Sequence, residues 1–132
     1  MRSAWRTAWQ RHLQGLPLEP LQAQLADLIA KHPEYHAVLA LTDEAATGAD
    51  AHAHQGTDAY LHLALHLALR EQVATDRPRG IARIHQQLSA AAGEFHAAEH
   101  RMIAVLEQAL WEAQRAGRMP DEQRYLEALR HL

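Results

Sequence analysis

The segment from residue 58 to residue 75 constrains the fold of this chain more than any other part of the sequence. Its first half, YLHLALHLAL, alternates with a period of two, as a strand would. It is, however, rich in Ala and Leu, nearly lacks β-branched residues and continues into the helix-forming run Arg70-Glu71-Gln72. We predict a helix that ends at the stop signal DRPRG, residues 76–80. Because apolar residues run nearly all the way round it, we expect this helix to be central and buried.

Two histidines of this helix, His62 and His66, are four residues apart and therefore lie on one face. A second pair with the same spacing, His96 and His100, lies in another strongly apolar helical pattern. Burying imidazoles is costly unless they find partners. Each pair is close enough to hold one metal ion or to give two ligands to a dinuclear centre, so the sequence predicts a metal site.

The other segments are predicted to be helical as well. A first helix runs from Ser3 to about Gln14, and Pro20 suits the first turn of a second. Pro33 interrupts that helix and starts another turn, because proline lacks an N–H and disfavours helix at the residue before it. Residues 42–57 are rich in Ala, Gly, Asp and Thr with weak periodicity, which indicates an irregular loop.

The last long stretch, from Ile81 to about Ala116, carries an apolar stripe that includes Phe95 and Leu110. The stripe keeps helical spacing straight through Gly93. It is therefore either one long helix or two helices that meet at that glycine. Pro120 is expected to open a short final helix.

Composition limits the possible functions. The 132 residues predict one domain over 1–132, an all-α bundle of about five to six helices with an irregular loop at about 42–57. Without cysteine, a metal must be held by nitrogen and oxygen. The net charge of −3 argues against a dedicated nucleic-acid binder. The first 16 residues interleave charges with apolar residues, so we expect no signal peptide, no membrane span and a cytoplasmic bacterial protein.

The second histidine pair comes with a carboxylate. Glu99 lies three residues after His96 and next to His100, so all three fall within about 100° of one helix face. The motif HAAEH therefore offers two imidazole nitrogens and one carboxylate together. Neutral imidazole is the commonest transition-metal ligand, and its other ring nitrogen normally donates to a carboxylate or a carbonyl.

Other candidates come from the segments around these helices. His36 in HPEYH, residues 32–36, is a further candidate nitrogen ligand from a crossing segment. His32 would sit at the cap before Pro33, which makes it a poorer choice. Glu71, five residues after His66, is rotated about 140° away on an ideal helix and reaches a metal only if the helix is distorted.

We therefore predict metal ligands at His36, His62, His66, His96, His100 and Glu99, with His32 and Glu71 as secondary candidates. A nitrogen-rich set suits iron, with one or two ions, and zinc second. A redox-active ion would bind or sense a small molecule such as O2, or support a small oxidase. Zinc with an open position would activate water for hydrolysis. No residue pattern names a substrate or a catalytic residue, so whether the protein is an enzyme stays open.

The competing prediction is a non-enzymatic helical module for protein–protein interaction. Its histidines would be buried polar groups that specify the packing of the core through hydrogen-bond networks. An exposed apolar patch would then dock a partner. Neither prediction fixes the oligomeric state.

Several motifs together resemble a family of small proteobacterial proteins built on a domain of unknown function. They cover nearly the whole chain and are AWQRHLQGLPLEPL, HPEYH, LHLALHLALREQ, DRPRGI, HAAEHRM and LWEAQRAGRMPDEQRYLEALR. One departure is Asp58-Ala59-Tyr60, where the family would have Asn-Pro-Phe. This resemblance implies no activity.

The paired histidines are also similar, more distantly, to hemerythrin-type four-helix bundles, which bind two irons in the bundle core. His62/His66 and His96/His100 match the HxxxH style of that family, and His66 to Glu71 resembles its spacing of histidine and acid. The resemblance implies a four-helix core; the order of ligands along the chain differs, so no activity is carried over.

Overall fold

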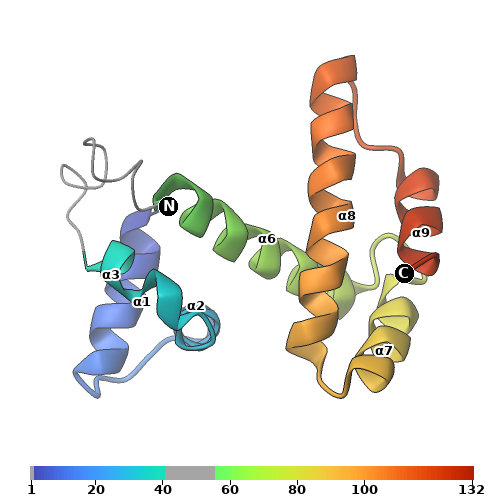
Figure 1. The fold of residues 1–132 in the computed structure, drawn as a ribbon. Coiled ribbons are helices and arrows are strands. Elements are labelled where there is room, and N and C mark those ends of the chain that lie inside the picture. The colour runs from blue at the N-terminus through green and yellow to red at the C-terminus, as the bar shows by residue number, and fades with distance from the viewer. Residues whose placement is uncertain (1, 41–55) are drawn as a thin grey trace. The chain divides into compact units, whose positions relative to one another are not determined.

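The computed structural model describes residues 2–40 and 56–132, and all regular structure in these two ranges is helical (Figure 1). The helices are α1 (Arg2–Leu13), α2 (Pro20–Ala30), the 3-10 turn η1 (Pro33–Tyr35), α3 (His36–Leu39), α6 (Gly56–Thr75), α7 (Ile81–Ala92), α8 (Phe95–Ala116) and α9 (Glu122–Arg130). The predicted all-α class is confirmed. The described residues form more helices than expected, because Pro33 and Gly93 each end one helix and start another.

The chain divides into two compact units, Met1–Ala64 and Leu65–Leu132, which we call unit 1 and unit 2. One bundle domain over 1–132 stays a prediction.

Unit 1 packs α1 against α2, followed by the short turns η1 and α3. Trp5 is fully buried and Trp9 is 9% exposed, so both indoles anchor this core. Pro20 occupies the first turn of α2 and Pro33 begins η1, as predicted, because a fixed φ suits the start of a helix and the missing N–H is not needed there.

The segment that most constrained the fold is indeed a helix, α6, and not a strand. It begins at Gly56, two residues earlier than predicted, and ends at Thr75. Most of the predicted loop at 42–57 lies outside the described residues. After the last turn, the carboxylate of Asp76 accepts hydrogen bonds from the N–H groups of Gly80 (3.0 Å) and Ala82 (3.1 Å), which fixes the turn into α7.

Unit 2 is built on the long helix α8, against which α7 and α9 pack. The chain breaks at Gly93, whose φ of +86° is a left-handed conformation that favours glycine, so the two-helix alternative is the correct one. Phe95 and Leu110 belong to the apolar stripe of the sequence, yet they are 47% and 43% exposed. Helix α8 buries only the side covered by its neighbours.

The final helix begins at Glu122 and not at Pro120. Asp121 is its N-cap, and its side chain accepts a hydrogen bond from the N–H of Arg124 at 3.1 Å. The aspartate cap directly after Pro120 thus decides where the helix begins. No helix within 2–40 or 56–132 is both long and apolar enough to cross a membrane.

Candidate metal centre

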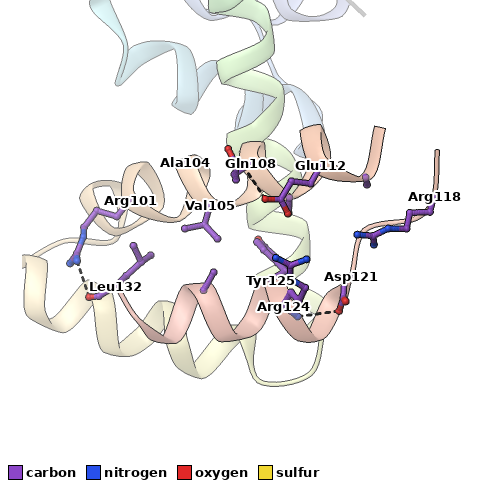
Figure 2. A pocket seen from close by; sticks show the side chains of 13 residues that line it. Arg101, Ala104, Val105, Gln108, Glu112, Arg118, Asp121, Arg124, Tyr125 and Leu132 are labelled. Atoms are coloured by element: carbon purple, nitrogen blue, oxygen red, sulfur yellow. Dashed lines mark hydrogen bonds between the residues drawn. The ribbon is translucent and has the colours of Figure 1, made fainter. Parts of the chain in front are cut away.

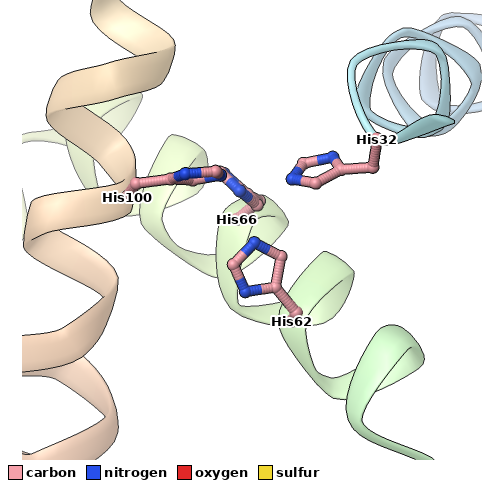
Figure 3. A group of neighbouring side chains, drawn as sticks. All are labelled: His32, His62, His66 and His100. Carbon is pink, nitrogen blue, oxygen red and sulfur yellow. The ribbon is translucent and has the colours of Figure 1, made fainter. Parts of the chain in front are cut away.

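The chemistry of unit 2 is concentrated where α6 meets the first turns of α8. Helix α6 presents His66 and, one turn later, Arg70. Helix α8 presents His96, Glu99 and His100 from its first two turns. His66 and Glu99 are buried, with side chains 0% and 2% exposed. Figure 3 shows His66 and His100 reaching toward one another from these two helices.

Glu99 is the centre of this group, and its two oxygens have different partners. Oε1 lies 3.3 Å from Nδ1 of His66 and 3.7 Å from Nδ1 of His96. Oε2 accepts a hydrogen bond from Nε of Arg70 at 3.2 Å. One oxygen is therefore neutralised by the guanidinium, while the other faces two imidazoles.

The three imidazole rings lie against each other. The ring centroids of His66 and His96 are 4.7 Å apart with an angle of 7° between the planes, a stacked pair. The ring of His100 lies 4.9 Å from that of His66 and 4.5 Å from that of His96. Donor atoms of His66, His96 and Glu99 all lie within 4.8 Å of one another, and so do donor atoms of His66 and His100.

Glu99 is held in its charged form. Burial by itself would raise its pKa, but the neighbouring imidazole of His66 and the charge of Arg70 outweigh burial and lower the pKa below the usual 4.5. An ionised carboxylate inside unit 2 is an anionic ligand ready for a cation.

A small pocket reaches the same carboxylate from another side. It has a volume of about 260 Å³, and Arg70, His85, Phe95 and Glu99 are among its lining residues. Burial lowers the pKa of His85, with the charge of Arg70 acting in the same direction and that of Glu99 against it. His85 lines this pocket but is not among the grouped metal donors of the described residues.

Unit 1 contains the other predicted histidines. The rings of His32 and His62 meet edge to face at 5.0 Å (Figure 3), and Tyr35 stacks on His32 at 5.3 Å. His36 is placed elsewhere: its Nε2 lies 3.0 Å from the carbonyl oxygen of Ile29 and its ring lies 4.6 Å from Trp9. The structure thus brings His32 together with His62, while His36 does not join them.

Two charged residues of α6 differ in how well their roles at the site were predicted from the sequence. Glu71 is exposed, as its rotation away from His66 predicted. Arg70 was treated only as a helix former, yet it is the cation that pairs with Glu99. Its position one turn after His66, on the same face of α6, was the signal that could have found it.

Imidazole nitrogens and one carboxylate make a donor set for a transition metal, and Mg²⁺ or Ca²⁺ would prefer more oxygen. Neither a curated protein nor a solved structure matches this chain. The likeness to hemerythrin-type bundles therefore remains a prediction from the sequence alone. A family model does match, and it covers residues 1–131. The chain belongs to the family described as Domain of unknown function (DUF1841).

Proposed function

We propose that unit 2 binds one transition-metal ion through His66, His96 and Glu99, with His100 as a fourth ligand. The observation that supports this proposal is the position of Glu99 Oε1, which is 3.3 Å from one imidazole nitrogen and 3.7 Å from another. Ligands bound to one ion at about 2.1 Å lie about 3.4 Å apart in a tetrahedron and about 3.0 Å apart at the right angles of an octahedron, so 3.3 Å is within reach of either geometry after a small shift. Neutral hydrogen bonds of good geometry are shorter, about 2.7–3.2 Å.

Binding requires some movement of the side chains. The imidazoles of His66 and His96 are nearly parallel, and a ring nitrogen directs its lone pair within the plane of its ring. Both rings must therefore turn about their Cβ–Cγ bonds before they point at one ion. His100 is exposed, and its ring already lies against the rings of His66 and His96.

The proposed metal is iron, with zinc as the second choice. Three imidazoles and one carboxylate suit both ions, and neither ion needs cysteine. Four protein ligands leave an octahedral iron two open positions, at which O2 or one of its reduced products would bind. We infer oxygen or redox sensing, or small oxidase chemistry, as the function. With zinc, His100 in the fourth ligand position would make the site structural. A water molecule in that position would allow hydrolysis.

The proposed ligand set contains fewer residues than the set predicted from the sequence. We leave His36 out because its Nε2 and its ring are engaged by Ile29 and Trp9. His62 lies one turn before His66 on α6 and stays a predicted ligand, which an alanine variant tests.

A second candidate function is a helical interaction module with structural histidines. It is favoured by the exposed apolar side chains near the end of α8, where Trp111 is 51% and Leu110 is 43% exposed. The pairing of Glu99 with Arg70 would then serve packing alone.

Metal analysis by plasma mass spectrometry tests the proposal on protein purified without an affinity tag or chelator. We expect about one equivalent of iron or zinc, lost in Glu99→Gln and retained in Glu107→Gln, which changes an exposed carboxylate two turns further along α8. Equal metal content in the two variants would exclude Glu99 as a ligand. If the protein contains no metal and fails to bind Fe(II) or Zn(II) at micromolar concentration, the metal-binding proposal is wrong. The helical interaction module is then the remaining candidate function.

A further inference from the structure

A second binding feature of unit 2 lies between α8 and α9, and none of its lining residues is a proposed metal ligand. It is a pocket of about 320 Å³, within the size range of small-molecule sites (Figure 2). We call it the α8–α9 pocket; its lining residues include Arg101, Val105, Ala109, Arg118, Arg124 and Tyr125.

The pocket exists because the side chains between the two helices are small. Four alanines line it, namely Ala104, Ala109, Ala113 and Ala128. Together with Val105 and the ring of Tyr125 they form an apolar lining that is too small to fill the space. Burial raises the pKa of the Tyr125 phenol, and its hydroxyl donates to Oε1 of Gln72 at 2.8 Å, so this polar group is already satisfied.

The ends of the pocket are basic. Figure 2 shows Arg101 at one end, and Arg118 with Arg124 toward the other. Arg101 donates one hydrogen bond to the carbonyl oxygen of Leu132 at 2.9 Å, and Arg118 donates one to Met119 at 3.4 Å. A guanidinium has five N–H donors, so most of them remain for a ligand.

The two acidic groups of the lining are occupied by neutral donors. Asp121 accepts from the backbone N–H of Arg124, and Glu112 accepts from the side-chain amide of Gln108 at 3.0 Å. The lining therefore offers the guanidinium groups of three arginines beside two acidic side chains.

We propose that the α8–α9 pocket binds a small carboxylate with an apolar body, such as a medium-chain fatty acid. The alanine-rich interior takes the hydrocarbon. A guanidinium at one end takes the carboxylate, because its planar fork matches the two oxygens. Inorganic phosphate would satisfy the arginines but gain nothing from the interior.

The test uses octanoate and the full chain, followed by amide chemical shifts. We expect saturable shifts confined to α8 and α9. Octanol, which has the same chain without charge, should bind about tenfold more weakly or worse, and phosphate should bind more weakly still. Arg101→Gln and Arg118→Gln show which end takes the carboxylate: at least one should weaken octanoate about fivefold.

Arg115→Gln is the matched control, because Arg115 stacks on Trp111 at 4.7 Å and does not line the pocket. It should leave the octanoate affinity unchanged, while Ala128→Leu should abolish binding by filling the space. Equal binding of octanoate and octanol would overturn the proposal, and so would unchanged affinity in both arginine variants. Self-association through this face, disrupted by Ala128→Leu and indifferent to octanoate, would assign the pocket to a second copy of the chain instead.

Discussion

Two five-residue motifs of this protein look alike in sequence and serve different purposes. HPEYH at 32–36 and HAAEH at 96–100 both place two histidines four residues apart with a glutamate between them. In the first motif Glu34 is exposed and both imidazoles face backbone carbonyls. In the second motif Glu99 is buried and faces imidazoles.

Continuity of the helix explains the difference. Pro33 ends α2, so His32 and His36 turn back to its last turn, where their ring nitrogens lie 2.7 Å from the oxygen of Leu28 and 3.0 Å from that of Ile29. The oxygen of Ile29 also accepts the backbone N–H of His32 at 3.0 Å, so the imidazoles add to the hydrogen bonds at the C-terminal end of α2. HAAEH lies within an unbroken helix, where the spacing does give a shared face. Two histidines at this spacing therefore share one helix face only when the helix between them is continuous.

The largest expected effect separates the two motifs by metal affinity. His96→Ala should weaken Fe(II) or Zn(II) binding by about a hundredfold or more, since even residues that only support a ligand are worth 10–100-fold. His36→Ala should change it less than about twofold, because His36 is engaged by Ile29. Competition with a chromophoric chelator measures both affinities. An equal loss in the two variants would remove the distinction between the motifs.

A smaller effect compares the two glutamates through stability, measured by urea unfolding with a chelator present. Glu99→Gln should lower the free energy of unfolding by about 2–3 kcal/mol, because it leaves Arg70 without its counter-charge. Glu34→Gln should stay within about 0.5 kcal/mol, since Glu34 is exposed. A Glu99→Gln variant as stable as the wild type would show that the buried ion pair contributes nothing net.

The difference in stability between wild type and Glu99→Gln should also depend on pH, with a defined sign. The pKa of Glu99 is lowered from 4.5 in the folded state, so its charge stabilises the fold above the unfolded pKa. This contribution is lost as the pH falls through the lowered folded pKa. The stability gap between wild type and Glu99→Gln should therefore be constant from pH 7 to about 5 and shrink below pH 4.5. A gap that widens on acidification would contradict the lowered pKa.

Sequence patterns predicted the helices well where the signal was local. The Ala and Leu content of α6 decided between helix and strand, and the prolines and Gly93 marked real boundaries. The HAAEH grouping came from helix geometry alone, and the short distances around Glu99 agree with it.

The features that sequence patterns did not predict depend on contacts between segments that are distant in the chain. Arg70 pairs with Glu99 across 29 positions of the chain, and no local period reveals such a pair. His36 was expected as a ligand from a crossing segment, but its ring nitrogen lies against the carbonyl oxygen of Ile29. The exposure of Phe95 and Leu110 likewise depends on which side of α8 its neighbours cover.

The smallest expected effect isolates the capping role of HPEYH. His36→Ala should lower the free energy of unfolding by about 1 kcal/mol, because the carbonyl of Ile29 loses its imidazole partner and Trp9 loses a ring contact. His12→Ala is the matched control: His12 is exposed and its ring also stacks on Trp9, at 5.1 Å, at the end of α1. The difference between the two variants therefore reports the hydrogen bond to Ile29 separately from the aromatic contact. An equal loss of unfolding free energy in both variants would mean that His36 stabilises the protein through its contact with Trp9 alone. The hydrogen bond to Ile29 would then not distinguish HPEYH from HAAEH.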